Sequence, residues 1–363
     1  MDLRLTRRSF AAGMAALACA AGLSFAGAPA ARADQQAEPA SDAKDADAKA
    51  SGTADAPAFP ITIEHAFGET VIEQEPERVV CLAWSNMEAP LALGIAPVGY
   101  SAPNYGLVDE NGTWPWVTEA YEALGAEAPV LFDDTDGFDL EAINDCEPDI
   151  ILAAYSGMTQ EDYDALSKIA PTIPFPKVPW QTFWREQTVT EGTALGKAAE
   201  AEQLVKDTDA LIAQKRKEYG IGDDVKGAMV MVGSGDLGTF YIYLPEDPRA
   251  AYLIDLGIEL PASVTELAQE ADPSAIALTL SAEEADRFDD LDIIVMYGDE
   301  ALLEEVQADP LLGSIPAIQR GAVALLGYDT PLGAGANPGV LGIPATIDEY
   351  LELIAQAIEK SKA

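Results

Sequence analysis

Residues 181–220 have the sequence QTFWREQTVTEGTALGKAAEAEQLVKDTDALIAQKRKEYG. They lie inside a run over residues 180–244 that lacks proline, although the chain contains 24 prolines. Basic residues near the end of the stretch, followed by Gly220, are typical of a helix C-terminus. Small and apolar residues recur at steps of three and four, the period of an amphipathic helix: Ala194, Ala198, Ala201, Val205, Thr208 and Ile212. We therefore expect one long helix over residues 181–219.

Short apolar segments alternate with helical patterns on both sides of this helix. Residues 79–82 and 149–153 precede it, and residues 228–232 and 292–297 follow it. Continuous apolar strands between helices predict parallel sheets that are covered on both faces. We expect an N-terminal α/β lobe over 60–180 and a C-terminal α/β lobe over 220–363, joined by the helix. A crossover helix inside one larger domain is the alternative.

Ligands of such sheets gather beyond the carboxyl ends of the strands. A faint internal repeat supports a correspondence between the two lobes. Residues 138–157 and 280–299 each combine a helical segment, an Asp-Ile-Ile strand start and a tyrosine near glycine. The repeat pairs Asp149 with Asp292, and it places Tyr155 and Tyr297 at strand ends.

The composition narrows the class of protein. The chain has 363 residues, 48% of them hydrophobic, and a formal charge of −41. An acidic surface of this kind repels nucleic acid and anionic lipid headgroups. It suits a protein that stays soluble outside the cell, or one from a salt-tolerant source. We expect no nucleic-acid partner.

Histidine and cysteine are scarce. The only histidine is His65, beside a glycine turn, where we expect a solvated surface position. Without further histidines the chain lacks the ligands of a His/Cys metal site and the base of a Ser-His-Asp unit, so we assign no catalytic and no metal-binding residues. Cys81 and Cys146 are interpreted as separate buried thiols, with a disulfide after export as the alternative.

The N-terminus predicts export. Residues 1–33 combine an arginine-rich start with an apolar segment and a small-residue cleavage site, and residues 6–10, TRRSF, match a twin-arginine signal. A lipid anchor through Cys19 is the weaker alternative, because the residues before it form a poor lipobox. Residues 34–59 contain few large apolar side chains and are expected to form a disordered acidic linker.

An ordered set of motifs resembles iron-siderophore substrate-binding proteins of ABC importers. ERVVCL at 77–82 and ALGIAPVG at 92–99 resemble the opening of these proteins. The later motifs, in order, are EPDIIL at 147–152, YSG at 155–157, LSKIAPT at 166–172, ALGK at 194–197, DPL at 309–311 and IPAIQRG at 315–321. Together they extend over nearly all of the chain after residue 60.

The resemblance implies two Rossmann-like lobes, with mostly parallel sheets, joined by a single long α-helix. A ferric siderophore would bind between the lobes and pass to an ABC permease. The iron is carried within the siderophore, so no cofactor is bound directly. The expected location is the periplasm or the outer face of the cytoplasmic membrane, and we expect a monomer.

Aromatic and arginine side chains are the candidate ligand contacts, because flat rings stack on ligands and a guanidinium pairs with ligand oxygens. In the first lobe and at the start of the helix they are Trp84, Tyr155, Ser156, Trp180, Trp184 and Arg185. In the second lobe they are Tyr241, Tyr243, Arg249 and Tyr297. Trp114 and Trp116 flank a proline in a loop and are candidates for a rim position, and packing within the lobe is the alternative for the tryptophans. Arginine is scarce, which favours a neutral, hydroxamate-like complex over an anionic catecholate.

Two glutamates are the candidate permease contacts. The resemblance implies one glutamate on the rim of each lobe, and the matching positions are Glu141 in FDLEAI and Glu283 in LSAEEAD. Both follow a residue suited to cap a helix, so each lies in a first turn. The alternative is that they only complement helix dipoles.

The sequence therefore predicts a binding protein without catalysis. A haem or corrinoid binding protein of the same fold is the first alternative. A metal-dependent hydrolase of the cell envelope is the alternative from another class, and the scarcity of histidine disfavours it.

Overall fold

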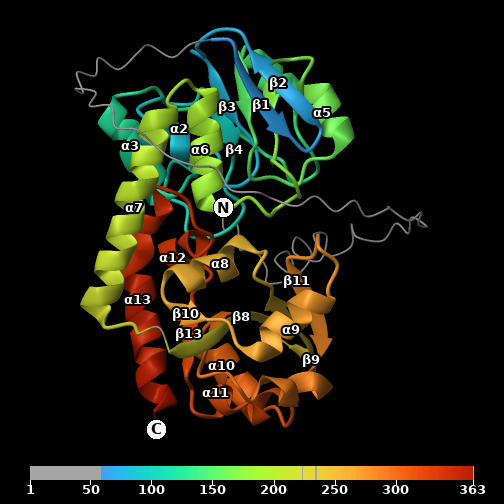
Figure 1. Ribbon diagram of the computed structural model, residues 1–363, viewed down its shortest axis with the longest axis vertical. Helices are drawn as coiled ribbons and strands as arrows, with labels where there is room; N and C mark the ends of the chain where they lie inside the picture. The colour runs from blue at the N-terminus through green and yellow to red at the C-terminus, as the bar shows by residue number, and fades with distance from the viewer. Residues whose placement is uncertain (1–58, 223, 234, 363) are drawn as a thin grey trace, which may run out of the picture. The chain divides into compact units, whose positions relative to one another are not determined.

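The computed structural model describes residues 59–222, 224–233 and 235–362 (Figure 1). The predicted leader over 1–33, its Cys19 alternative and residues 34–58 of the predicted linker lie outside the described residues. The described part contains one five-stranded sheet, one six-stranded sheet and a two-stranded hairpin. The predicted fold class, α/β with two lobes, is confirmed.

The first lobe holds a parallel sheet with the strand order β5-β4-β3-β6-β7. Its strands are β3 (Val79–Cys81), β4 (Gly99–Ser101), β5 (Val130–Phe132), β6 (Ile150–Leu152) and β7 (Thr172–Ile173). Its helices are α2 (Glu88–Ala92), α3 (Pro115–Leu124), α4 (Leu140–Asp145) and α5 (Gln160–Leu166). The antiparallel hairpin of β1 (Ile61–His65) and β2 (Gly68–Ile72) precedes this sheet, as the glycine turn predicts.

Both faces of the first sheet are buried. Along β3, Val79 and Cys81 belong to one hydrophobic cluster and Val80 belongs to another, because successive strand residues point to opposite faces. Cys146 packs in the second cluster, and both cysteines are free. The interpretation of Cys81 and Cys146 as separate buried thiols is therefore confirmed.

The second lobe holds a mixed sheet with the order β11-β9-β8-β12-β13, and β10 pairs with β8. Its strands are β8 (Val225–Gly233), β9 (Asp236–Tyr243), β10 (Ile258–Glu259), β11 (Ala277–Ser281), β12 (Ile293–Tyr297) and β13 (Val323–Leu326). Its helices are α8 (Pro248–Asp255), α9 (Ala262–Glu270), η1 (Ala282–Phe288), α10 (Glu300–Ala308), η2 (Leu312–Ser314) and α11 (Pro316–Gln319). Strand β9 is antiparallel to β8 and β11, since the short connection between β8 and β9 reverses the chain. This sheet is therefore less parallel than expected.

The stretch expected to form one helix forms two. Helix α6 (Trp184–Ala194) ends before Gly196, whose φ of 73° lies in the left-handed region, and α7 (Ala198–Tyr219) follows. Helix α7 ends at Gly220, also left-handed with φ 66°, as the stop signals predict. The long helix is thus shorter than predicted, because a glycine at 196 allows the chain to turn.

The C-terminal segment returns to the first lobe. Helix α12 (Pro331–Gly335) contributes Ala334, and the following loop contributes Leu341, to a core cluster of the first lobe. Helix α13 (Gly342–Ser361) starts there and runs beside α7 (Figure 1). The assignment of all residues 220–363 to the second lobe needs this correction.

The internal repeat has a structural meaning. The Asp149 carboxylate, just before β6, accepts hydrogen bonds from the backbone N–H groups of Glu77 and Arg78 at 2.7 and 2.9 Å. The Asp292 carboxylate, just before β12, accepts one from Lys226 at 2.8 Å. Each aspartate therefore fixes the start of the neighbouring strand.

Candidate functional site

Five aromatic residues follow or end parallel strands at their carboxyl ends. Trp84 follows β3, Tyr105 follows β4 and Tyr155 follows β6 in the first lobe, while Tyr297 ends β12 and Tyr328 follows β13 in the second. Strand ends of this kind are where ligands of α/β sheets bind. We call these five residues, with Tyr243 and Arg249, the aromatic cluster.

Trp84 is held between other rings. Its ring centroid lies 4.9 Å from that of Trp114 and 6.3 Å from that of Tyr105. The neighbouring residues Ala83 and Ser85 have φ angles of 64° and 57°, which non-glycine residues adopt only at an energetic cost. The Trp84 indole N–H is buried without a hydrogen-bond partner among the described residues, so it is a donor that a ligand oxygen could use.

Tyr155 and Trp180 meet edge to face, with ring centroids 5.4 Å apart. Trp180 has a φ of 60°, and its backbone N–H donates to the Ser156 carbonyl at 3.0 Å. A Cβ on Gly157 would come within 2.0 Å of the Trp180 indole nitrogen, so only glycine admits the ring there. The Tyr155 hydroxyl lies 3.4 Å from Oδ1 of Asn337, which comes from the segment after α12.

Arg249 supplies the positive charge of the cluster. Its guanidinium donates to both carboxylate oxygens of Asp247, at 2.8 and 2.6 Å, and lies 4.3 Å from the centre of the Tyr243 ring. Burial lowers the pKa of Arg249, but Asp247 together with the neighbouring Tyr243 and Tyr297 outweighs burial, so this pKa is raised well above its usual value. The Asp247 side chain is fully buried beside the guanidinium. Because the two charges are opposite, the pair adds almost no net charge to the cluster.

The two halves of the cluster touch. The rings of Tyr105 and Tyr297 meet nearly perpendicularly at 5.4 Å, and Tyr297 stacks on Tyr328 at 6.4 Å. Burial is the main cause that raises the pKa of Tyr105, Tyr155, Tyr243 and Tyr297. These phenols therefore stay protonated at neutral pH and can donate hydrogen bonds to a ligand.

Asn86 is a residue of the candidate site that the sequence interpretation missed. Its side-chain amide donates to the carbonyls of Leu82, Trp84 and Tyr155, and its Oδ1 accepts from the Tyr155 N–H at 2.9 Å. One fully buried side chain thus ties the ends of β3 and β6 together. No local pattern marks it, since its partners lie up to 101 residues away.

Two predicted contacts, Ser156 and Tyr241, are not part of the aromatic cluster. Ser156 is fully buried, and its hydroxyl donates to the Ala153 carbonyl at 2.8 Å. Tyr241 lies two residues before Tyr243 on the same face of β9 and is half-buried. The structure brings together, or joins to the cluster, six of the predicted residues: Trp84, Tyr155, Trp180, Tyr243, Arg249 and Tyr297.

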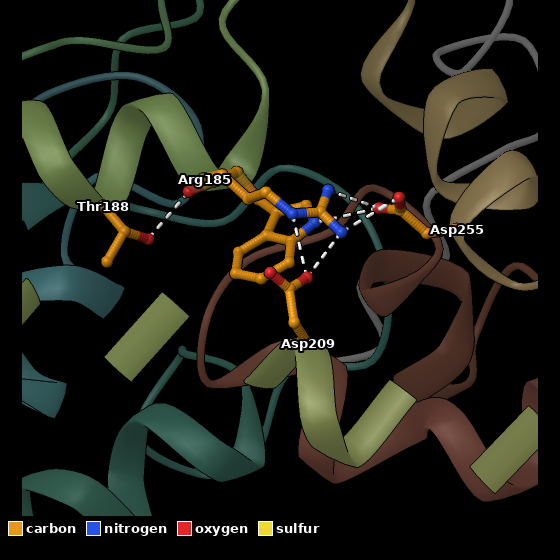
Figure 2. Close-up of polar contacts among 5 residues, drawn as sticks. Arg185, Thr188, Asp209 and Asp255 are labelled. Carbon is orange, nitrogen blue, oxygen red and sulfur yellow. Dashed lines mark hydrogen bonds and ion pairs between the residues drawn. The ribbon is translucent and has the colours of Figure 1, made fainter. Parts of the chain in front are cut away.

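Trp184 and Arg185 form a separate junction between helices. Figure 2 shows Arg185 pointing toward Asp209 of α7 and Asp255 of α8. Arg185 donates to Asp209 at 2.6 Å and to Asp255 at 2.8 Å, and the buried Trp184 indole also donates to Asp255, at 3.1 Å. The two residues brace α6 against α7 and α8 and are not brought to the aromatic cluster.

The two candidates for the rim are packed in the lobe instead, and the surface position expected for His65 is wrong. Trp114 and Trp116 are buried, not at a rim, because Trp114 packs under Trp84 and the Trp116 indole donates to Glu88 at 2.9 Å. His65 is 8% exposed and packs against the Tyr163 ring, 5.0 Å away. The rings of Phe67 and Tyr163 cover His65 although Ala66 and Gly68 of the turn are exposed, and a glycine signal cannot reveal this cover.

Glu141 and Glu283 are exposed in the first turns of α4 and η1. Asp139 and Ser281 cap these turns, each accepting a hydrogen bond from a backbone N–H. The neighbouring Glu284 is half-buried and pairs with Arg287, whereas Glu283 is exposed. Both glutamates have the exposure that contact with a partner requires.

Other features of the described residues lie outside the cluster. A hollow of about 340 Å³ is lined by Arg78, Val98, Val130, Ala142, Asp145 and Cys146. A second, of about 270 Å³, lies beside Arg185 and Asp255. Within residues 59–362, as far as they are described, no three His, Cys, Asp or Glu side chains come together to hold a metal ion. In the same part of the chain, no helix is both long and apolar enough to span a membrane.

Comparison with known proteins agrees with this geometry. A family model described as periplasmic binding protein matches residues 79–330. The structure of Streptococcus pneumoniae TIGR4 PiaA in complex with ferrichrome is 44% identical, covers 83% of this chain and 99% of that chain, and has a TM-score of 0.79. A second structure of PiaA, described as an iron uptake ABC transporter substrate-binding protein, is 43% identical with a TM-score of 0.76.

Two curated relatives are more distant. The Fe(3+) dicitrate-binding periplasmic protein FecB of Escherichia coli K12 is 25% identical over 284 residues, which are 75% of this chain and 84% of that protein. The probable siderophore-binding lipoprotein YfiY of Bacillus subtilis is 26% identical over 239 residues, which are 65% of this chain and 67% of that protein.

Proposed function

The chain belongs to the periplasmic binding protein family, and we propose that it captures a ferric siderophore between its two lobes and delivers it to the permease of an ABC importer. The resemblance to iron-siderophore substrate-binding proteins is confirmed by its relatives. The observation that carries the proposal is the aromatic cluster, to which both lobes contribute at their strand ends.

The cluster suits a ligand that brings its own metal ligands. Rings of Trp84, Tyr105 and Tyr297 offer flat apolar faces, and the Trp84 indole N–H offers a donor. Binding would exchange the contact between Tyr105 and Tyr297 for contacts with the chelate. The protein then needs only to surround the complex, and we assign it no chemical step.

The charge of the cluster favours a neutral complex. Arg249 is the cation of the cluster, and the buried Asp247 compensates it. A triply anionic ferric catecholate would meet no net positive charge there, and desolvating it would cost several kcal/mol. A ferric trihydroxamate carries no net charge, and the relative PiaA was crystallised with ferrichrome. We therefore infer a hydroxamate-type ligand.

Delivery requires contact with a permease. Glu141 and Glu283 are exposed, one on each lobe, and we infer that they dock on the permease of the importer. Replacing both by alanine should reduce uptake by cells or by a reconstituted importer. Glu284→Ala is the matched control, because Glu284 is adjacent but pairs with Arg287. Equal uptake by the double variant and the control would contradict this role.

The export signals predicted for residues 1–33 support a location in the cell envelope. The relative FecB is described as a periplasmic protein and the relative YfiY as a lipoprotein. The acidic surface and the completeness of the cluster within one chain are consistent with a monomer. Fractionation of cells that express the full chain, followed by size-exclusion chromatography, tests both inferences.

Tryptophan fluorescence tests the function directly, because Trp84 and Trp180 belong to or adjoin the cluster. The ligand panel is ferrichrome, a ferric catecholate, haem and a corrinoid, with metal-free hydroxamate as the control. We expect quenching by ferrichrome with a Kd below about 1 µM. Quenching by haem or a corrinoid alone would favour the alternative ligand class, and silence across the panel would overturn the proposal.

A further inference from the structure

A line of buried polar side chains runs from helix α6 to the backbone beneath the aromatic cluster. Glu191 and Gln187 lie on successive turns of α6. The Gln187 side-chain N–H₂ donates to Glu191 Oε1 at 3.4 Å and to Asn86 Oδ1 at 3.2 Å. Glu191, Gln187 and Asn86 are 0%, 4% and 0% exposed, respectively. An amide has two N–H donors, so Gln187 can make both bonds at once.

Asn86 passes this connection to the site. Its Nδ2 donates to the Trp84 carbonyl at 3.1 Å and to the Tyr155 carbonyl at 3.0 Å. The residues on either side of Trp84 have positive φ angles, and such backbone persists only where the surroundings hold it. Asn86 Oδ1 accepts from the Tyr155 N–H at 2.9 Å and from the Gln187 amide at 3.2 Å. The Gln187 amide is thus the side-chain donor that supports the orientation in which Asn86 holds the backbone of Trp84 and Tyr155.

Glu191 anchors the far end of the line. Its Oε2 has no hydrogen-bond partner among the described residues. The titratable groups that face it are Glu88 from α2 and Cys81 from β3, and neither is a cation. Burial raises the pKa of Glu191 well above its usual value; the Gln187 bond offsets this in part, and Glu88 raises it further. A neutral carboxylic acid fits this environment, since an unpaired buried charge is costly.

We propose that Gln187 and a neutral Glu191 are positioning residues of the ligand site, which act through Asn86 on the walls formed by Trp84 and Tyr155. The inference rests on the proposed function, because it assigns what sets the affinity of that site. It adds a group of residues that no sequence pattern connects to the ligand, since α6 lies about a hundred residues from Asn86 along the chain.

Calorimetric titration with ferrichrome tests the inference. In Gln187→Leu and Glu191→Leu we expect the Kd to rise by about tenfold, because the amide of Asn86 loses its support. Glu191→Gln keeps the acceptor and the neutral charge, so its Kd should stay within about twofold of the wild type. Thr188→Val is the matched control. Thr188 is buried in α6, but among the described residues its hydroxyl bonds only the Trp184 carbonyl (Figure 2), so this variant should also bind normally.

The outcomes separate the two proposals. If the wild type binds ferrichrome and Gln187→Leu binds it with the same Kd, the positioning role is overturned. The role is also overturned if the Kd of Thr188→Val rises as much as that of Gln187→Leu. Tenfold weaker binding by Glu191→Gln would show that a charged carboxylate is needed and overturn the neutral form. If the wild type binds no chelate, the proposed function fails, and the indole NMR signal of Trp84 then judges the positioning role. That signal should move in Gln187→Leu and stay in place in Thr188→Val; an unmoved signal in Gln187→Leu would overturn it.

Discussion

At the scale of single residues, the ion pair of Arg249 and Asp247 combines two roles. Asp247 caps helix α8, since its Oδ1 accepts from the Arg249 backbone N–H at 2.8 Å, and its carboxylate also holds the guanidinium over Tyr243. The pair thus fixes the start of α8 and the one cation of the aromatic cluster in the same place.

Removing one partner of this pair should destabilise the protein strongly. Arg249→Met leaves the fully buried Asp247 carboxylate without its cation, and we expect the free energy of unfolding to fall by about 3 kcal/mol. Adding Asp247→Asn removes the unpaired charge and keeps a residue suited to cap a helix, so it should restore most of the loss. Urea unfolding measures both variants. A double variant as unstable as Arg249→Met would contradict the account.

His65 gives a prediction on pH. The Phe67 backbone N–H donates to His65 Nδ1 at 3.2 Å, and Nε2 lies 2.9 Å from the Thr70 hydroxyl, which itself donates to the Thr172 carbonyl. This arrangement suits the neutral imidazole with its proton on Nε2, and burial lowers the pKa of His65 below 6.5. The unfolded chain therefore binds the proton more readily, so this contribution to stability is complete above about pH 6.5 and declines as the pH falls toward the folded pKa.

His65 is the only histidine, so its NMR signals can be assigned without ambiguity. Titration should give a pKa below 6.5 in the folded protein. The difference in unfolding free energy between wild type and His65→Gln should shrink on acidification below that pH. A folded pKa at or above the unfolded value would contradict the assigned environment.

The sequence pointed to part of the candidate site for a physical reason. Trp84, Tyr155 and Tyr297 were predicted because they follow or end short apolar strands, and the same rule applied to every strand would also have found Tyr105 and Tyr328. Trp184 and Arg185 misled the prediction because their partner Asp255 lies 70 or more residues away. Aromatic and arginine side chains serve packing as readily as binding.

At the scale of elements, helices α6, α7 and α8 meet where Asp255 accepts from both Arg185 and Trp184. The bonds are partly exposed, with side-chain exposures of 38% for Arg185 and 20% for Asp255, so solvent screens them. The hollow beside them offers water access to the junction. The junction stabilises the packing of α6 without entering the ligand site.

Asp255→Asn should therefore lower the unfolding free energy by about 1 kcal/mol and leave ferrichrome binding unchanged. Asp209→Asn should cost less, because the Asp209 side chain is 42% exposed and, within the described part of the chain, bonds Arg185 alone. Thermal or urea unfolding at low and high salt measures both, and the effect of Asp255→Asn should diminish at high salt. A larger loss in Asp209→Asn would contradict the role assigned to Asp255.

The elements themselves were predictable to different degrees. The hairpin around Gly68 and the end of α7 at Gly220 follow from glycine signals that leave little choice. The break between α6 and α7 was missed because Gly196 lies within a helical period and only its left-handed backbone ends the helix.

At the scale of the whole molecule, the two lobes are connected twice. Helix α7 leads from the first lobe to the second, and the segment after β13 returns to the first lobe, where Glu88 accepts from the N–H groups of Leu341 and Gly342 at 2.8 and 2.9 Å. A carboxylate at the N-terminus of α13 complements the helix dipole there. Sequence alone assigned this segment to the second lobe, because a short apolar stretch does not reveal which core it joins.

The most direct test of the central claim is a calorimetric titration of ferrichrome into wild type and Trp84→Ala. A ferric chelate held by the aromatic cluster predicts a Kd below about 1 µM for the wild type and binding at least about tenfold weaker for the variant. Folding of the variant is verified by its unfolding transition. Equal affinity in both proteins, or the absence of binding heat in the wild type together with unchanged fluorescence, would contradict the account.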